Sequence, residues 1–255
     1  MFLQVKTIPL IVSIMFFSGL SLTLTPELAC MKYSNSPMLT GATPDSATPP
    51  GQIDTAALSY LALGDSYTIG QSVAVSDRYP LQTAKLLRSD SLDYSDPDII
   101  ATTGWTTADL LTAMQNTKFN HTYHVVTLLI GVNNQYQGRS KAEYSLEFTE
   151  LVKRSITLAG GNPTHVIVLS IPDYSVTPFA QGLNTTYIAA QIDSFNAINK
   201  VVSQDYKLHY LDITGESRKA ASDPTLIASD GLHFSGKEYA VWAGLLEPLI
   251  KEISK

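Results

Sequence analysis

The sequence predicts an α/β protein in which a parallel sheet of five strands is covered by helices on both faces. Short apolar runs, typical of buried strands, alternate along the chain with longer segments of helical periodicity. The strongest of these runs are apolar throughout, which is the pattern of strands buried on both faces of a parallel sheet. Right-handed crossovers would bring the carboxyl ends of all five strands to one edge.

Each element follows from a local signal. Strands are expected at residues 60–63, 98–101, 124–130, 165–170 and 208–211, and helices at 73–87, 105–114, 141–159, 186–203 and 236–253. Pro80 predicts a break in the first helix, and Thr106 is a suitable cap for the second. Gly160 and Gly161 are expected to end the third helix. Residues 212–235 show no regular pattern and are expected to be irregular.

Composition limits the class of protein. The 255 residues are 44% hydrophobic and 16% charged, which suits one domain of up to about 200 residues with extensions. The net charge is −6 and there is no basic run. Composition therefore does not favour a surface for nucleic acid or for an anionic membrane.

The amino-terminal part differs from the rest. Residues 1–29 are expected to be a signal peptide for export, because Lys6 precedes a mostly apolar run without charges. A membrane-spanning anchor is the alternative, since the run approaches the length of a bilayer. Residues 30–57 are rich in Ser, Thr, Pro and Gly and predict a disordered tether. The folded domain is then expected at 58–255.

Cys30 is the only cysteine, so no intrachain disulfide exists. Its place after an apolar leader resembles the lipid-modified cysteine of bacterial lipoproteins, although Glu27 stands where that pattern has an aliphatic residue. Lipid anchoring and plain secretion both stay open. We expect an exported protein that is periplasmic, secreted or lipid-anchored at the bacterial cell envelope.

The turn after the first strand reads Gly-Asp-Ser-Tyr at residues 64–67. Ser66 would lie near a helix start, where backbone N–H groups and the helix dipole favour negative charge. A serine there can attack a carbonyl while its own N–H helps to hold the oxyanion. The alternative role for Ser66 is a plain helix cap. Asp65 is expected to brace the turn through backbone hydrogen bonds, with electrostatic tuning of the site as the alternative.

Three further segments are expected at the same edge of the sheet. Gly104 follows the second strand and Asn133 the third, so the Gly104 N–H and the Asn133 amide can complete an oxyanion hole. Asp230 and His233 lie in one turn before the last helix. An aspartate there can take the Nδ1 proton of the histidine and leave Nε2 facing the serine.

This ordered set of motifs resembles the SGNH (GDSL) hydrolase superfamily. The matching positions are Gly64, Asp65, Ser66 and Tyr67, then Gly104, then Gly131 and Asn133, and finally Asp230 and His233. They extend over about residues 59–240. The resemblance implies a flavodoxin-like, three-layer α/β/α fold and hydrolysis of esters or thioesters. The chain has the overall look of bacterial GDSL-type esterases related to lysophospholipase L1 and thioesterase I.

The resemblance also implies roles for these residues. Ser66, His233 and Asp230 would form the catalytic triad, and Ser66, Gly104 and Asn133 the oxyanion hole, with no metal or cofactor. The partner would be a small-molecule, lipid or glycan ester, and a monomer is expected. A lysophospholipid or fatty-acyl ester competes with an acetylated carbohydrate as substrate. The alternative from a different functional class is a binding module of the cell envelope that has the same fold but no catalytic activity.

The remaining residues of interest are less specific. Four residues follow the third and fourth strands and are expected either to line an acyl or leaving-group pocket or to pack within loops: Asn134, Tyr136, Tyr174 and Phe179. A classical α/β-hydrolase elbow is excluded because Thr68 stands where it requires glycine. His121 and His124 lack a carboxylate or cysteine cluster and do not predict a metal site.

Overall fold

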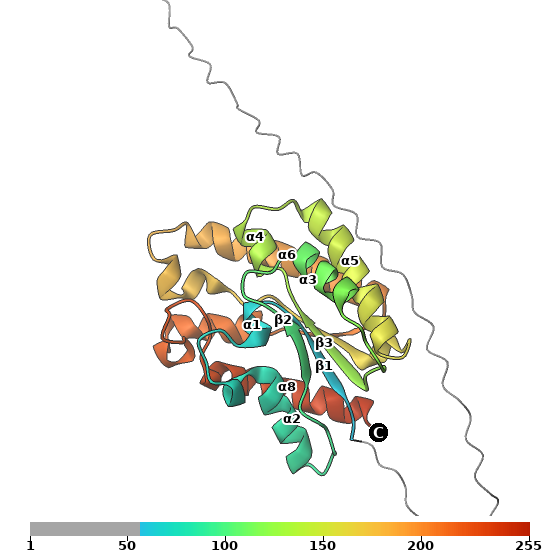
Figure 1. Ribbon diagram of the computed structural model, residues 1–255. Helices are drawn as coiled ribbons and strands as arrows, with labels where there is room; N and C mark the ends of the chain where they lie inside the picture. The colour runs from blue at the N-terminus through green and yellow to red at the C-terminus, as the bar shows by residue number, and fades with distance from the viewer. Residues whose placement is uncertain (1–56) are drawn as a thin grey trace, which may run out of the picture. The chain divides into compact units, whose positions relative to one another are not determined.

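Five apolar runs form one parallel sheet in the computed structural model, which describes residues 57–255 (Figure 1). The strands are β1 (Tyr60–Gly64), β2 (Asp98–Ala101), β3 (Val125–Leu129), β4 (Val166–Leu169) and β5 (His209–Leu211), in the order β2-β1-β3-β4-β5. All four pairings are parallel. The predicted fold class is confirmed.

Helices cover both faces of this sheet. α2 (Tyr79–Ser89) and α8 (Gly236–Ile253) pack together on one face, and α3 (Thr107–Asn116), α5 (Lys141–Leu158) and α6 (Thr185–Asp205) lie on the other (Figure 1). The strand order explains this division. The chain crosses from β1 to β2 in one direction and from β2 to β3 in the other, so right-handed crossovers place the connecting helices on opposite faces. Ligands of such sheets bind at the carboxyl edge where the direction reverses.

The core forms because the central strands are apolar on both faces. Every residue of β1, β3 and β4 is buried. From α8, the side chains of Tyr239, Trp242 and Leu246 are fully buried against this sheet layer. Gly64, at the carboxyl end of β1, is level with Ala101 of β2 and Leu129 of β3. The carboxyl ends of these three strands are therefore level with one another.

The helix starts follow local sequence signals. Thr106 caps α3 and forms a reciprocal capping box with Asp109. Pro80 marks the start of a helix and not a break within one, because the helix predicted at residues 73–87 begins only at Tyr79. It lies in the first turn of α2, after the short 3₁₀ helix η1 (Val75–Asp77), and a proline at that position costs nothing because its missing N–H would be unpaired anyway.

Several short helices have no counterpart in the sequence prediction. Two of them begin directly after strands, α1 (Ser66–Ile69) after β1 and α4 (Val132–Tyr136) close behind β3. Residues 212–235 are also only partly irregular, since they contain α7 (Thr214–Ser217), η5 (Arg218–Ala221) and η6 (Pro224–Leu226). η2 (Pro163–His165), η3 (Tyr174–Val176) and η4 (Pro178–Ala180) complete the set. A single turn is too short to show helical periodicity.

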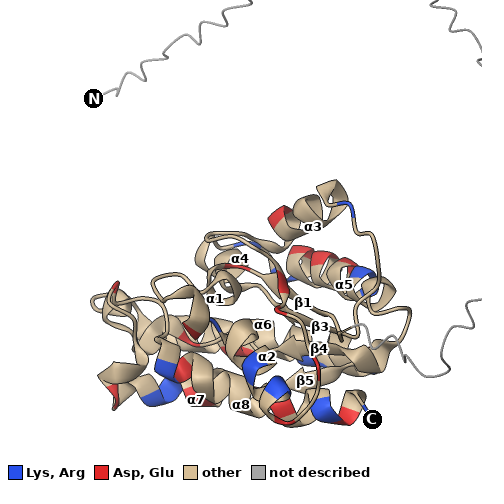
Figure 2. Cartoon of the chain, turned by 60° about the horizontal axis from the view of Figure 1, so that its bottom comes forward, with Lys and Arg blue, Asp and Glu red and all other residues tan. Residues whose placement is uncertain are grey.

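Acidic and basic residues are interspersed along the described part of the chain. In Figure 2, blue and red residues lie close together at the end of α7 and along α8, and no continuous blue band is seen in that view. Ion pairs such as Lys219–Glu216 and Lys237–Asp223 join neighbours of opposite sign. Among residues 57–255, no helix has the length and apolarity to cross a bilayer. The predicted signal peptide, the tether and Cys30 lie outside the described residues.

Candidate active site

Ser66 is the first residue of α1 and follows the carboxyl end of β1. The cap of this helix is Asp65, whose Oδ1 accepts a hydrogen bond from the backbone N–H of Tyr67 at 3.0 Å. Ser66 is therefore not a helix cap, and its hydroxyl is available for another role. The bracing predicted for Asp65 is present.

The Asp65 carboxyl has an unusual environment. Its side chain is buried, and within the described part of the chain Oδ2 has no hydrogen-bond partner. Burial raises the pKa of Asp65 to about 7, and the backbone hydrogen bonds from Tyr67 and Gly131 oppose this shift. A carboxyl group that titrates near neutrality thus lies beside Ser66.

Asp230 and His233 are in direct contact, as their spacing predicts. Oδ2 of Asp230 lies 2.6 Å from Nδ1 of His233, and Oδ1 accepts the backbone N–H groups of Leu232 and His233 at 3.0 and 2.9 Å. Partial burial acts to raise the pKa of Asp230, but hydrogen bonds from Ser72, His233 and the backbone outweigh it and hold the pKa well below its usual range. An ionised carboxylate at Nδ1 fixes the proton on that nitrogen and leaves Nε2 as an acceptor.

A ring of the first motif packs on this histidine. Tyr67, which follows Ser66, is almost fully buried, and its ring meets the imidazole of His233 edge to face with centroids 5.8 Å apart. The ring of Tyr67 also packs against Trp242 of α8. The imidazole is therefore positioned by the core as well as by its own turn.

Backbone and amide donors lie across from these groups. Gly104 has a φ of +86°, a conformation that favours glycine, and it lines the cleft described below. Asn133 is in α4, and its Nδ2 donates to the carbonyl of Trp105 at 2.9 Å. That bond uses one of the two amide hydrogens and leaves the second for another acceptor.

These residues meet in a cleft of about 250 Å³. Of the residues singled out from the sequence, the cleft is lined by Ser66, Tyr67, Gly104, Asn133, Tyr136, Tyr174, Phe179 and His233. Asp230 contacts His233 and does not itself line the cleft. Within the described residues no hydrogen bond joins the Ser66 hydroxyl to His233, although both side chains line the same space. Such bonds are often long in free enzymes and tighten when substrate is bound.

The structure does not bring Asn134 to the cleft. Its side chain is buried, Oδ1 accepts the N–H of Thr107 at 3.0 Å, and Nδ2 donates to the Thr107 hydroxyl at 2.6 Å. Asn134 thus fastens α4 to the start of α3. Two adjacent asparagines have different surroundings because successive helical residues point about 100° apart.

The outer wall of the cleft is aromatic. The rings of Tyr136, Tyr174 and Phe179 contact one another with centroids 6.1–6.3 Å apart. Tyr174 is buried, whereas Tyr136 is 60% exposed and Phe179 is 42% exposed. The sequence prediction left this wall open between pocket lining and loop packing, and both descriptions apply.

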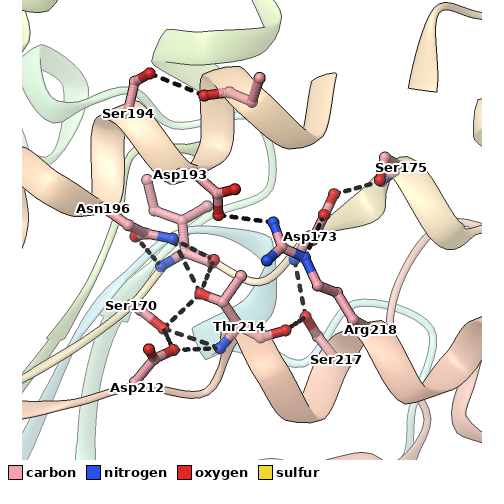
Figure 3. Close-up of polar contacts among 12 residues, drawn as sticks. Ser170, Asp173, Ser175, Asp193, Ser194, Asn196, Asp212, Thr214, Ser217 and Arg218 are labelled. Atoms are coloured by element: carbon pink, nitrogen blue, oxygen red, sulfur yellow. Dashed lines mark hydrogen bonds and ion pairs between the residues drawn. The ribbon is translucent and has the colours of Figure 1, made fainter. Parts of the chain in front are cut away.

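A polar network fixes the loop that carries Tyr174 and Phe179 (Figure 3). The buried carboxylate of Asp173 accepts Nε of Arg218 at 2.8 Å, and the same guanidinium donates to Asp193 of α6 at 2.7 Å. Asn196 of α6 binds both the N–H and the carbonyl of Ile171, at 2.7 and 2.9 Å. The loop after β4 is thereby tied to α6 and to the segment after β5.

Several residues that line the cleft or hold its parts were not predicted. Thr103 and Leu232 line it beside Gly104 and His233. Ser72 donates to Asp230 at 2.6 Å, and Gln71 accepts the Thr103 hydroxyl at 2.7 Å. Thr103 and Leu232 directly precede Gly104 and His233 in the sequence, and this adjacency was a signal that they would also reach the cleft. Nothing in the sequence indicates Ser72 or Gln71, because their role depends on a turn with left-handed backbone.

The fold has many solved counterparts. The structure described as TesA superposes with a TM-score of 0.61 at 17% identity, covering 76% of this chain and 99% of that one. A lipase/acylhydrolase from Enterococcus faecalis gives 0.58 at 20% identity, covering 77% and 95%. An acetylxylan esterase, Axe2, from Geobacillus stearothermophilus gives 0.57 at 18% identity, covering 76% and 94%. These likenesses concern the fold.

The sequence itself decides the family. A comparison with curated proteins gave no match. The family model described as GDSL-like lipase/acylhydrolase matches residues 62–241. That range begins within β1, ends within α8 and contains every motif residue that lines the cleft. The chain belongs to the GDSL-like lipase/acylhydrolase family and is an ester-bond hydrolase.

Proposed function

We propose that the protein hydrolyses carboxylic esters through an acyl-enzyme formed on Ser66. The observation that carries this proposal is the contact of 2.6 Å between Asp230 and His233, at a cleft that Ser66, Gly104 and Asn133 also line. Acyl transfer requires an imidazole oriented by a carboxylate, a nucleophilic serine at a helix start, and backbone or amide donors for the oxyanion.

In the first half-reaction, Nε2 of His233 takes the proton of the Ser66 hydroxyl while Oγ attacks the acyl carbon. The oxyanion accepts the N–H groups of Ser66 and Gly104 and the second Nδ2 hydrogen of Asn133. Asp230 stabilises the imidazolium. Collapse of the intermediate expels the alcohol or thiol, which takes the proton from His233.

In the second half-reaction, His233 removes a proton from water as the water oxygen attacks the acyl carbon of the Ser66 ester. The same donors hold the second oxyanion. Collapse releases the carboxylic acid, and Oγ of Ser66 recovers its proton from His233. The chain returns to its starting state without a net change in protonation.

The cleft favours a short acyl group. Its volume of about 250 Å³ is below the range of roughly 300–1,000 Å³ that encloses drug-sized ligands. A lysophospholipid would need a longer groove than this cleft provides. We therefore propose short-chain acyl esters as the best substrates, ahead of the long-chain lysophospholipids that the family resemblance also suggests.

An acetylated carbohydrate is the second candidate substrate. The partly exposed rings of Tyr136 and Phe179 stand at the cleft and offer flat apolar faces on which a sugar ring can stack. The acetyl group would then enter the small cleft while the sugar remains outside. An exported enzyme, whether anchored through Cys30 or secreted, would meet such substrates at the cell envelope. We therefore propose export as well.

The test compares the native protein with Ser66→Ala on p-nitrophenyl acetate, butyrate and palmitate, with acetylated xylan and lysophosphatidylcholine as natural-type substrates. We expect turnover to vanish in the variant while its circular dichroism is unchanged, and activity to fall from acetate to palmitate. Preserved turnover in Ser66→Ala would refute the mechanism. Faster hydrolysis of palmitate and lysophosphatidylcholine would refute the substrate assignment alone. Specific binding of acetylated xylan without hydrolysis of any ester would support a binding module instead.

A further inference from the structure

The turn after α1 brings an exposed serine to the Asp230–His233 pair. α1 is a single turn that ends at Gly70, and both Gly70 and Ser72 have a φ of +67°. A serine in the left-handed region is uncommon, because its Cβ approaches the backbone there. The reversal directs the Ser72 hydroxyl to Asp230, far away in the sequence.

The hydrogen bonds of Asp230 divide evenly between its two oxygens. Oδ1 accepts the N–H groups of Leu232 and His233 from its own turn. Oδ2 accepts hydrogen bonds from Nδ1 of His233 and from the hydroxyl of Ser72, both at 2.6 Å. Apart from the imidazole itself, Ser72 is thus the group that locates Oδ2 among the described residues.

This second bond matters because Asp230 is not enclosed. Its side chain is 30% exposed, against 9% for that of His233. Water competes for the lone pairs of an exposed carboxylate, so an oxygen held by the imidazole alone is poorly located. A charge-assisted hydrogen bond from Ser72 holds Oδ2 within hydrogen-bonding distance of Nδ1 when the imidazole takes up a proton.

The same turn is joined to the other side of the cleft. The N–H of Gln71 donates to the carbonyl of Ser66 at 2.9 Å, and Oε1 of Gln71 accepts the hydroxyl of Thr103 at 2.7 Å. Thr103 precedes Gly104. The turn at residues 70–72 therefore contacts the segments of three of the proposed catalytic groups, namely Ser66, Gly104 and Asp230.

We propose that Ser72 is a positioning residue of the active site, which acts through Asp230 to hold the carboxylate against His233. This inference rests on the proposed function of Asp230 and His233. Ser72 does not line the cleft, and its hydroxyl bonds to Asp230. Its loss should lower kcat and leave KM unchanged, because the binding surface of the cleft does not include it.

Ser72→Gly is the sharpest variant, since glycine adopts a φ of +67° without strain and removes only the hydroxymethyl group. We expect kcat for p-nitrophenyl acetate to fall on the order of tenfold, the effect of losing one hydrogen bond to a charged group. Ser91→Gly is the matched control. Ser91 has the same φ of +67° and is exposed, but it lies between α2 and β2, away from the cleft.

A double-mutant cycle separates positioning from a general effect on the loop. In an Asp230→Ala background, Ser72→Gly should change kcat by less than about twofold, because the group through which it acts is gone. Equal losses in both backgrounds would overturn the proposal, as would an unchanged kcat in the single variant. Ser72→Ala, which retains Cβ, repeats the cycle and must give the same result should the glycine variant fold poorly.

The cycle also distinguishes this inference from the proposed function. If Asp230→Ala alone leaves kcat unchanged, the proposed triad fails and the Ser72 proposal fails with it. If Asp230→Ala lowers kcat strongly while Ser72→Gly does not, the triad stands and only the positioning role of Ser72 is refuted. Thermal unfolding of each variant verifies that the comparison is made between folded proteins.

Discussion

The ring of Tyr67 meets the imidazole of His233 edge to face, with centroids 5.8 Å apart. Tyr67 belongs to the motif after β1 and His233 to the turn before α8, so this contact joins the first and last motifs of the family directly. Because Tyr67 also packs on Phe234 and Trp242, the position of the proposed base depends on the aromatic core beneath it.

Substitutions at Tyr67 should separate ring packing from the hydroxyl. We expect Tyr67→Phe to keep kcat within about threefold, since the ring that supports His233 remains. Tyr67→Leu removes an aromatic pair worth about 0.5–1.5 kcal/mol beyond its buried area and should lower kcat on the order of tenfold. Steady-state kinetics on p-nitrophenyl acetate measure both. Equal activity in the two variants would show that the contact does not position the imidazole.

The buried carboxyl of Asp65 should make stability depend on pH. Its pKa of about 7 is higher than the ordinary aspartate value that it regains on unfolding, so between about pH 4 and 7 the native state holds a proton that the unfolded state has lost. The free energy of unfolding should then fall as pH rises through this window, by up to about 1.4 kcal/mol per pH unit from this group. Below about pH 4 the carboxyl is protonated in both the native and the unfolded state, so this group adds no pH dependence there and none of the stability has been lost.

Asp65→Asn removes that titration and keeps an acceptor for the N–H of Tyr67. Urea unfolding at pH 4.5, 5.5, 6.5 and 7.5 should show a smaller loss of stability in the variant than in the native protein. If the free energy of unfolding had the same pH dependence in both proteins, Asp65 would have the same pKa in the folded protein as in the unfolded chain, contrary to our prediction.

The adjacent asparagines of α4 should differ in what they support. Asn133→Ala removes a proposed oxyanion donor and should lower kcat on the order of a hundredfold with little change in stability. Asn134→Ala leaves the N–H of Thr107 without its partner and should reduce the free energy of unfolding by about 1–3 kcal/mol. Kinetics and urea unfolding of both variants make the comparison. A larger kcat loss at Asn134 than at Asn133 would contradict these assignments.

The ion pair behind the aromatic wall should stabilise the loop that carries Tyr174. Arg218→Met leaves the buried carboxylate of Asp173 without its charged partner and should lower the free energy of unfolding by about 1–3 kcal/mol. Arg139→Met is the matched control, because the pair of Arg139 with Glu143 is exposed and spaced i,i+4 on the surface, where such pairs contribute about 0.5 kcal/mol or less. Equal effects in urea unfolding would show that burial of Asp173 does not matter.

The elements that could be predicted from the sequence are those with several residues of one periodicity. β3 is predicted by a continuous apolar run and α8 by a long helical pattern. The cap at Thr106 and the stop at Gly160 are predicted by residue types with one strong preference. α1, α4 and α7 were missed because one turn contains too few residues for a period. The break predicted at Pro80 is wrong because proline can mark either a break in a helix or the start of one, and the preceding residues decide which.

The site was predictable where chemistry lies within a motif. The contact of Asp230 with His233 follows from their spacing, whereas the hydroxyl of Ser72 reaches the same carboxylate across the fold. The different surroundings of Asn133 and Asn134 depend on how α4 is rotated about its axis, which no five-residue sequence reveals. The tie between Asp173 and Arg218 likewise depends on how the loops after β4 and β5 pack.

The central claim is that His233 activates Ser66, and covalent labelling with a p-nitrophenyl alkylphosphonate tests it most directly. We predict one equivalent of phosphonate per chain, located by peptide mass spectrometry on Ser66, and labelling that is slowed at least a hundredfold in His233→Ala. A folded protein that remains unlabelled, or that is labelled at another serine, would contradict the account.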